Sequence, residues 1–524
     1  MSLRIFNTLT DRKEEIDPIE PGRIGMYVCG VTVYDMCHIG HARAYVTADV
    51  IYRTLLHAGL DVTYVRNFTD LDDKIIVRAN ELGIDCRELS DRYIREFYTD
   101  MDALGIRRPQ LEPRVTDHIP DIIRTVEQLI ERGHAYVDGG DVFFDVPSFP
   151  DYGKLSRRPL DDAMCGARVA VDERKKCPLD FVLWKASKEG EPAWDSPWGM
   201  GRPGWHIECS TMSTKYLGDT FDIHGGGKDL IFPHHENEIA QAEAATGKPF
   251  SRVFFHNGFV NIDKEKMSKS LGNFFTIREI ANRYDPEALR YFLLTTHYRS
   301  PINFEVDFVC PHCRAPIARA HVEARACPGC GKTFDEAEAA AAVHFPALEE
   351  ASCRLEYLYA TIDRMGETLD KRATGVGDLI RAEEIEAIKP RFVEAIEDDF
   401  NAAAALGVLS DAMRLANEVM DNKEDRPEGM ITSSIQALSM AIGEICEVLG
   451  LLDREPSKAL ESIRGCAMRA RGVIEAEIGH LVQERADARA AKDFARADAV
   501  RDQLHEMGVE LMDSPQGTTW KIRR

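Results

Sequence analysis

Apolar and polar positions at the start of the chain predict an α/β fold. Residues 25–30 form an apolar run that ends at a glycine, and residues 42–57 repeat apolar side chains at helical spacing. Residues 61–66 are β-branched and aromatic, which is typical of a second strand. A strand, a helix and a strand in this order predict a doubly wound (Rossmann-type) parallel sheet.

A different pattern follows in the next part of the chain. Apolar residues repeat at helical spacing over 122–130, and Gly133 is expected to end that helix. Two short apolar runs, 135–137 and 142–146, flank a Gly-Gly turn and predict a hairpin. Because residues 116–200 are also rich in proline, glycine and charge, we expect them to form an insertion that splits the nucleotide domain.

Helical periodicity dominates the C-terminal part. Residues 346–455 are almost wholly helical in pattern, and residues 456–507 continue with alanine-rich and charge-rich helices. Two short runs, 509–512 and 518–522, then predict a closing hairpin.

Composition limits the class of protein. The 524 residues suggest several domains, and no run of about 18 apolar residues predicts a membrane span. The first residues lack the basic and apolar pattern of a secretory signal, so we expect a cytoplasmic location. Thirteen cysteines are then better explained by metal binding and ordinary thiols than by disulfides. The net charge of −23 argues against loose binding to nucleic acid but leaves room for a specific RNA partner on local basic patches.

A candidate metal site centres on the stretch from Phe232 to Glu238. Pro233 suits a first helical position, so His234 and Glu238 are expected four residues apart on one helix face. Taken alone, such a pair is more often a solvated surface pair. Cys29 and Cys209 are candidates for the missing ligands, because two thiolates, an imidazole and a carboxylate suit zinc.

Four other cysteines form a second candidate site. Cys310 and Cys313 make one Cys-x-x-Cys knuckle, and Cys327 and Cys330 make another after thirteen residues. This spacing predicts a four-thiolate structural zinc in a small ribbon.

Two separated motifs favour phosphate binding. His38 and His41 flank Gly40 where the first strand leads into a helix, a position suited to a phosphate chain. Lys266 and Lys269 lie in Lys-Met-Ser-Lys-Ser, whose lysines suit the β- and γ-phosphates of ATP. Each motif alone is also explained by a solvated surface loop. Together, the His-Ile-Gly-His and Lys-Met-Ser-Lys-Ser sequences resemble the class I aminoacyl-tRNA synthetases.

Within that class the chain resembles the cysteinyl-tRNA synthetase family over nearly its whole length. The resemblance rests on the stretches Tyr27 to Asp35, Asn67 to Lys74, Gly201 to Ser210, and His224 to Gly227 continuing into Pro233 to Glu238. It implies a class I catalytic domain that uses L-cysteine, ATP with magnesium and cysteine tRNA. It also implies that an active-site zinc is held by Cys29, Cys209, His234 and Glu238.

The resemblance carries roles onto further residues. Charge on the departing phosphates is expected to be stabilised by His38, His41, Lys266 and Lys269. The nucleotide is expected to contact Gly40, Gly225, Gly226, Asp229 and Lys269. Thr69 and Trp205 are expected to line and cap the amino-acid pocket, where a core aromatic and a capping hydroxyl are the simpler alternatives. Trp520 and Arg523 are expected to contact the tRNA.

Pattern and resemblance together predict five parts. These are a catalytic domain over 1–115 and 201–308, a connective insertion over 116–200, a zinc ribbon over 309–334, a tRNA-binding helical bundle over 346–455 and an anticodon-recognition domain over 456–524. The ribbon departs from the usual family chain. It is expected to be structural, and the alternative is that it touches the tRNA or sets an angle between domains.

Two other functions compete with this hypothesis. A cysteine ligase of the same family that needs no tRNA would share the zinc and ATP motifs, but it would have little use for the helices from 346 onward. A non-catalytic zinc and RNA binding protein would not need the intact His-Ile-Gly-His and Lys-Met-Ser-Lys-Ser motifs.

Overall fold

The computed structural model describes residues 3–158, 173–263, 265–266, 274–371, 376–421, 428–514 and 517–522. The chain divides into two compact units. The first contains Met1–Phe259, His297–Pro301 and Phe392–Ala405, and the second contains Val260–Thr296, Ile302–Arg391 and Leu406–Arg524. No helix in the described ranges is long and apolar enough to cross a membrane.

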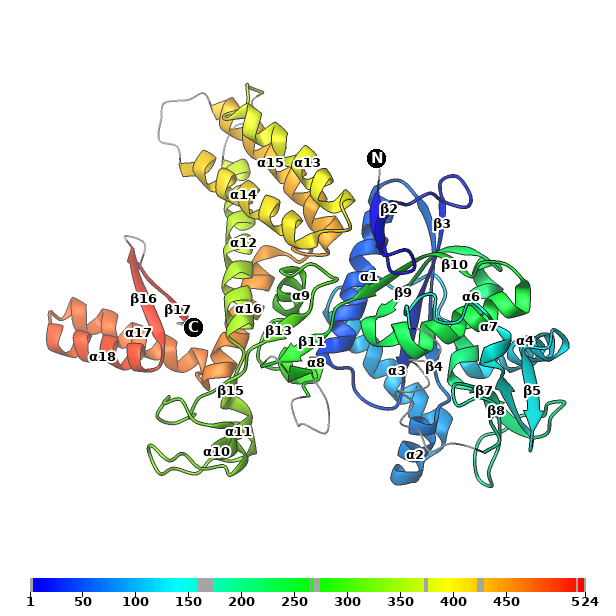
Figure 1. Ribbon diagram of the computed structural model, residues 1–524. Coiled ribbons are helices and arrows are strands. Elements are labelled where there is room, and N and C mark those ends of the chain that lie inside the picture. The colour runs from blue at the N-terminus through cyan, green and yellow to red at the C-terminus, as the bar shows by residue number, and fades with distance from the viewer. Residues whose placement is uncertain are drawn as a thin grey trace. The chain divides into compact units, whose positions relative to one another are not determined.

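A four-stranded parallel sheet forms the core of the first unit. Its order is β10-β9-β3-β4, with the strands β3 (Arg23–Thr32), β4 (Asp61–Thr69), β9 (Phe221–Gly227) and β10 (Ser251–Asn257). Helix α1 (Ile39–His57) covers one face, and α6 (Trp205–Leu217) and α7 (Glu236–Thr246) lie on the other (Figure 1). Helices on both faces bury the apolar strands, so the predicted α/β class with a doubly wound parallel sheet is confirmed.

An antiparallel sheet follows the first two parallel strands and leads back to α6. Its order is β5-β6-β7-β8, with the strands β5 (Ala135–Asp138), β6 (Asp141–Phe144), β7 (Phe181–Ala186) and β8 (Gly201–Pro203). The predicted hairpin is therefore present as β5 and β6, and α4 (Ile119–Glu131) precedes it. Gly204 links β8 to α6, where a Cβ atom would lie 2.0 Å from the Val182 carbonyl oxygen. Only glycine permits this close approach, which fixes the start of α6 beside the sheet.

The remaining elements of the first unit lie around these sheets. They are β1 (Arg4–Asn7), β2 (Arg12–Glu15), α2 (Asp73–Leu82), α3 (Cys86–Ala103) and the short turns Val115–Asp117, Val146–Ser148, Lys228–Leu230 and Ile231–His235. The buried side chains of α4, α6 and α7 join those of the two sheets in one apolar core.

The second unit begins with short strands and helices that precede the cysteine knuckles. They are β11 (Val260–Ile262), β12 (Glu265–Lys266), α8 (Ile277–Ala281), α9 (Pro286–Leu294), β13 (Ile302–Phe304) and β14 (Asp307–Phe308). The knuckle segment contains α10 (Arg319–Glu323) and α11 (Glu336–Ala341) and returns through β15 (Val343–His344), which pairs with β14.

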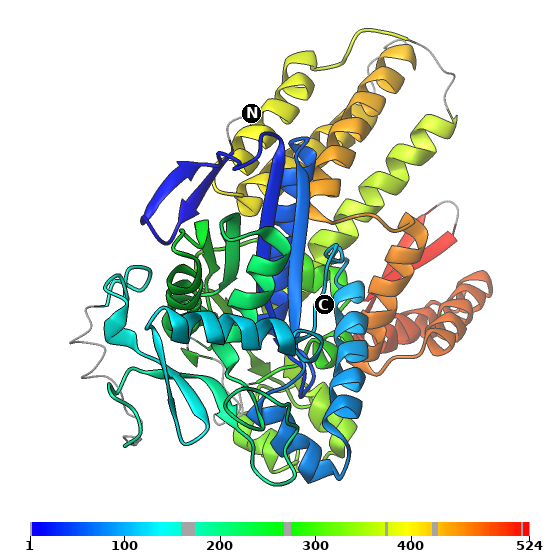
Figure 2. The same cartoon turned by 90° about the vertical axis from the view of Figure 1, so that its right-hand side faces the viewer.

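Long helices make up most of the rest of the chain, as the periodicity predicts. They are α12 (Pro346–Lys371), α13 (Ala382–Glu397), α14 (Ala402–Asp421), α15 (Glu428–Leu449), α16 (Pro456–Arg471), α17 (Glu475–Ala490) and α18 (Phe494–Glu506). The end of α13 and the start of α14 belong to the first unit. Helix α12 packs against α9, α15 and α16, and it is seen lengthwise in Figure 2. The chain closes with the hairpin of β16 (Val509–Ser514) and β17 (Gly517–Ile522), which packs on α17 and α18.

The turn before α7 agrees with the predicted helix start. Regular α7 is recorded from Glu236, and Pro233 and His234 precede it in the turn Ile231–His235, where only Phe232 has extended backbone angles. An extended residue directly before Pro233 is the geometry expected before a first helical position, and His234 contacts Glu238 four residues later.

Candidate active site

Four side chains from separate elements meet between the parallel sheet and the helices on one of its faces. Cys29 comes from β3, Cys209 from α6, His234 from the turn before α7 and Glu238 from α7. Their ligand atoms all lie within 4.8 Å of one another, and all four side chains are buried. The four residues nominated from the sequence are therefore brought together.

A β-bulge sets the position of Cys29. The pairing of β3 with β4 shifts register between Val28 and Val31, so Cys29 and Gly30 lie in the irregular segment. A Cβ atom on Gly30 would lie 1.5 Å from the Asn67 carbonyl oxygen, and the Gly30 N–H donates to Asn67 Oδ1 at 2.8 Å. Bulges re-aim side chains next to functional sites, and this one is held by a contact that only glycine allows.

Short contacts link the acidic and basic members of the set. His234 Nε2 lies 2.9 Å from Glu238 Oε1, and the Cys29 thiol donates to the same oxygen at 3.3 Å. Burial alone would lower the pKa of His234, but the Glu238 carboxylate and Cys209 outweigh it and raise that pKa to about 10. Burial likewise opposes ionisation of Glu238, but His224 and His234 hold its pKa well below the usual range.

The two thiols differ in their readiness to ionise. A hydrogen bond from Cys29 lowers the pKa of Cys209 to about 6, against the effect of burial. Burial raises the pKa of Cys29 well above its ordinary value, and the neighbouring Cys209 adds to the effect. One thiolate therefore forms readily next to a carboxylate, and a cation there would favour ionisation of the second thiol as well.

This donor set fits a zinc ion. Two sulfurs, one imidazole nitrogen and one carboxylate oxygen are ligands that zinc accepts in a tetrahedral arrangement. A second group, Cys29, His224, His235 and Glu238, also has its ligand atoms within 4.8 Å of one another and shares two members with the first. The set with two sulfurs is the softer one and contains the more acidic thiol, so it is the better zinc site.

Buried histidines surround these ligands, and sequence reasoning assigned them no role. His235 Nδ1 lies 2.9 Å from His256 Nε2, and His206 Nδ1 lies 2.9 Å from His234 Nδ1. Burial lowers the pKa of His206 and His235 well below the ordinary value and that of His256 to about 3, so all three are neutral at pH 7. A neutral His206 can fix the orientation of the His234 ring, as groups behind metal ligands commonly do. The His-His-Glu sequence was the available signal for His235.

The two residues expected around the amino acid lie next to this set. The Trp205 ring stacks on the His234 ring at a centroid distance of 4.2 Å, and Trp205 is 40% exposed. Thr69 is buried, and its hydroxyl donates to Glu208 Oε2 at 3.0 Å. Burial raises the pKa of Glu208 well above its usual range. Trp205 thus has one face against a candidate ligand and remains open to solvent.

The two histidines of the His-Ile-Gly-His motif lie at the start of α1. Their rings stack at a centroid distance of 3.8 Å, and the Gly40 N–H donates to His38 Nδ1 at 3.0 Å. The helix N-terminus and the two imidazoles form a surface suited to anionic oxygens.

The glycine-rich segment ends β9 on the same sheet. A Cβ atom on Gly225 would lie 2.0 Å from the Phe255 ring, and one on Gly226 would lie 2.9 Å from the His235 ring. Asp229 follows in an exposed turn. The close packing explains the glycines without a ligand, and their contact with a nucleotide stays a prediction.

Three predicted residues are not placed by the structure. Lys269 and Arg523 lie outside the described residues, and for Lys266 only the backbone of β12 is described. Trp520, on β17, is half-buried, with the Arg464 guanidinium 5.2 Å from its ring centroid.

The four cysteines of the two knuckles also converge. The sulfur atoms of Cys310, Cys313, Cys327 and Cys330 lie within 4.8 Å of one another, and all four cysteines are free. The Arg314 N–H donates to the Cys310 carbonyl at 3.0 Å, and the Gly331 N–H donates to the Cys327 carbonyl at 2.9 Å. The two knuckles are thus equivalent turns that aim four thiols at one point, an arrangement that fits a tetrahedral metal ion.

Known proteins are similar in sequence to this chain over its whole length. The family described as "tRNA synthetases class I (C) catalytic domain" matches residues 15–311. The DALR domain matches 391–453, and the "Cysteinyl-tRNA ligase anticodon binding domain" matches 472–520. The cysteine–tRNA ligase of Geobacter metallireducens is 50% identical, and that of Pelobacter propionicus is 51% identical, each with 100% of both chains covered.

A solved structure supports the fold. The methionyl-tRNA synthetase of Mycobacterium tuberculosis in complex with methionyl-adenylate superposes with a TM-score of 0.57, over 84% of this chain and 93% of that one, at 16% identity. Sequence identity at this level supports the fold alone. Taken with the full-length relatives, the family matches show that this chain belongs to the cysteine–tRNA ligase family of class I aminoacyl-tRNA synthetases.

Proposed function

We propose that this protein activates L-cysteine with ATP to form cysteinyl-adenylate and then transfers the cysteinyl group to the 3′ end of cysteine tRNA. The observation that carries the proposal is the buried set of Cys29, Cys209, His234 and Glu238, in a chain that matches cysteine–tRNA ligases over its full length. Family membership supports the reaction, and the donor set supports the choice of amino acid.

Activation joins the amino acid to the nucleotide. The cysteine carboxylate attacks the α-phosphorus of ATP, the bond to the bridging oxygen breaks, and pyrophosphate leaves. We assign His38 and His41 to the negative charge that shifts onto the departing phosphates, because both imidazoles lie at a helix N-terminus. Lys266 and Lys269 are assigned to the same charge from the family motif, Gly40, Gly225, Gly226 and Asp229 to the nucleotide, and magnesium is expected with ATP.

Selection of the amino acid needs more than pocket size. A hydrophobic pocket separates substrates that differ by one small group by only about 1 to 3 kcal/mol. When zinc is bound, it supplies a Lewis acid that favours a soft thiolate over the hydroxyl of serine. The chain provides two thiols, His234 and Glu238 to hold that ion, while Trp205 covers the site and Thr69 lines it.

One of the four protein ligands is expected to yield to the substrate. Cys29, Cys209, His234 and Glu238 would hold a zinc ion, which would supply a position for the thiolate of cysteine if one of the four made room. We propose that Glu238 would be the one to yield, because a carboxylate is the hardest of the four donors and His224 Nε2 lies 3.1 Å from Glu238 Oε2.

The second half of the chain supports transfer to RNA. The DALR and anticodon-binding matches cover 391–453 and 472–520, which a ligase acting on a small amine would not need. We assign Trp520 and Arg523 to the tRNA, Trp520 by stacking and Arg523 by charge. We assign the four cysteines of the knuckles to a structural zinc that stabilises a small ribbon.

Two assays on the full chain test the proposal in series. The first measures cysteine-dependent exchange of labelled pyrophosphate into ATP without tRNA, with serine and alanine as controls. The second measures transfer of labelled cysteine to tRNA. We expect exchange with cysteine alone and transfer to cysteine tRNA. Exchange without transfer to tRNA would favour the tRNA-independent ligase, and absence of exchange would overturn the enzymatic proposal.

A further inference from the structure

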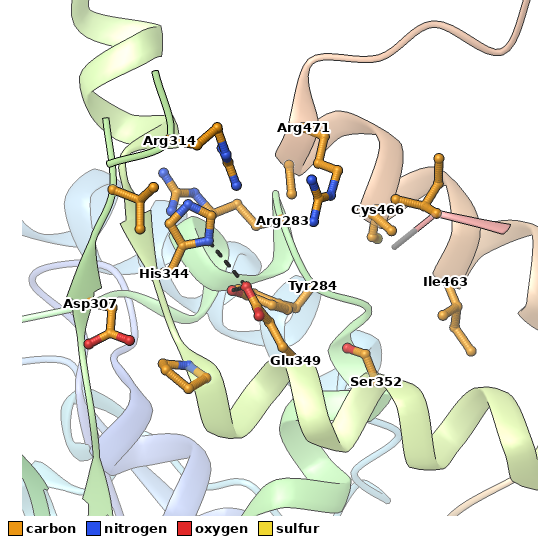
Figure 3. Close-up of a pocket in the computed structure, with 15 residues that line it drawn as sticks. Arg283, Tyr284, Asp307, Arg314, His344, Glu349, Ser352, Ile463, Cys466 and Arg471 are labelled. Atoms are coloured by element: carbon orange, nitrogen blue, oxygen red, sulfur yellow. Dashed lines mark hydrogen bonds and ion pairs between the residues drawn. The ribbon is translucent and has the colours of Figure 1, made fainter. Parts of the chain in front are cut away.

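A cavity in the second unit is lined by three arginines from distant parts of the sequence. It has a volume of about 220 Å³ and lies where α16, the start of α12, the cysteine knuckles and the connection between α8 and α9 come together (Figure 3). Arg283, Arg314 and Arg471 line it (Figure 3). We call it the arginine cavity.

Arg283 brings a buried positive charge to the cavity. Its guanidinium donates to the Val343 carbonyl, and it makes no hydrogen bond or ion pair with a carboxylate among the described residues, although Glu279 attracts it electrostatically. Burial lowers the pKa of Arg283. A buried guanidinium whose charge is not paired gains most from an anion that enters beside it.

Arg314 is held at the cavity by the cysteine knuckle. It directly follows Cys313 and has the left-handed φ of 58°, which lets its N–H close the turn onto the Cys310 carbonyl. Its exposed side chain makes no ion pair or hydrogen bond with any described residue. A non-glycine residue in this conformation is uncommon, and here it aims a free guanidinium at the cavity.

Arg471, in the last turn of α16, is the third arginine of the cavity. Its guanidinium packs against Gly508, where a Cβ atom would lie 2.4 Å from Arg471 Nη1. Gly508 also has a φ of 80°, so both the close approach of the Arg471 guanidinium and the backbone angle favour glycine at this position. The turn between α18 and β16 thus leaves room for this side chain.

The acidic groups that line the cavity, Glu349 and Asp307, are fewer than its three arginines. Glu349 receives hydrogen bonds from His344 Nδ1 at 3.1 Å and from the Tyr284 hydroxyl at 3.5 Å, so its charge is largely engaged. Asp307 also lines the cavity (Figure 3). His344 Nε2 is buried and has no hydrogen-bond partner in the described part of the chain. Three guanidiniums suit the oxygens of a phosphate group.

We propose that the arginine cavity binds a phosphodiester of the tRNA backbone, with Arg314 as the contact that the cysteine knuckle contributes. The proposal rests on the function proposed above. A net charge of −23 opposes loose binding of RNA, so phosphate contacts are expected where cations outnumber acids. The cavity is such a place. The ribbon insertion then has a role beyond its own stability.

The salt dependence of tRNA binding tests the proposal. The variants are Arg314→Gln and Arg471→Gln, and the matched control is Arg319→Gln, an exposed arginine of the same ribbon that pairs with Glu323 at 3.0 Å and does not line the cavity. We expect Arg314→Gln to weaken tRNA binding and to reduce the slope of log affinity against log salt by about one, the loss of one phosphate contact. The control is expected to keep the wild-type slope. Because Arg314 is exposed, this variant should fold even if Arg471→Gln does not.

Three outcomes separate the explanations. An unchanged slope and affinity in Arg314→Gln, in a protein that still charges tRNA, would overturn this proposal and leave the proposed function intact. Absence of cysteine-dependent pyrophosphate exchange in the wild-type chain, measured without tRNA, would instead refute the proposed activation of cysteine. Inorganic phosphate that binds the wild type but not Arg314→Gln, with tRNA affinity unaffected, would identify a free anion as the occupant and would also overturn the proposal.

Discussion

Replacement of Cys209 by serine tests which of the two overlapping donor sets holds the metal. The variant removes one sulfur from a site of four ligands and keeps the size of the side chain. Zinc binding at such sites is worth about 10 to 16 kcal/mol, so one ligand accounts for about 2.5 to 4 kcal/mol. At about 1.4 kcal/mol per factor of ten, zinc affinity should fall about a hundredfold to a thousandfold.

The assay is competition for zinc with a chromogenic chelator, combined with metal analysis of the purified protein. Cys86→Ser is the matched control, because Cys86 is free and belongs to neither cysteine cluster. We expect the wild type and the control to retain two zinc ions and Cys209→Ser to lose one. The reasoning would be refuted if Cys209→Ser kept both ions while His235→Gln lost one, since the metal would then be held by the alternative set.

Three further predictions follow from other contacts. Asp399→Asn should destabilise the first unit by about 3 kcal/mol in urea unfolding, because this buried carboxylate accepts from Tyr298 at 2.7 Å and Arg299 at 2.6 Å. The same change at its partly exposed neighbour, Asp398→Asn, should cost less than about 1 kcal/mol, and equal effects would contradict this reasoning. Trp205→Ala should raise the KM for cysteine about threefold to tenfold without loss of zinc, since it removes a ring stacked at 4.2 Å on His234; an unchanged KM would argue against a capping role. Cys327→Ser should lose the second zinc but retain pyrophosphate exchange, and loss of exchange would show that the ribbon supports catalysis.

Ligand chemistry made much of the candidate metal site predictable. Soft thiols, an imidazole and a carboxylate at Cys29, Cys209, His234 and Glu238 could be nominated from residue types and from the resemblance. The bulge that re-aims Cys29 could not, because it depends on the pairing of β3 with β4 and on the contact of Gly30 with the neighbouring strand. Periodicity shows where a strand lies but not where its register slips.

Burial explains the residues that were missed. His235 and His256 carry no periodic signal, and their neutral state follows from enclosure by elements far apart in the sequence. The arginine cavity was beyond sequence reasoning for the same reason, since Arg283 and Arg471 come together only in the folded unit.

A crystal structure with bound L-cysteine, with anomalous diffraction recorded at the zinc edge, tests the central claim most directly. The account predicts a zinc peak among Cys29, Cys209 and His234, with the sulfur of the substrate about 2.3 Å from it. A cysteine whose sulfur lies away from the metal, or the absence of a zinc peak among these three side chains, would contradict the proposed basis of selectivity.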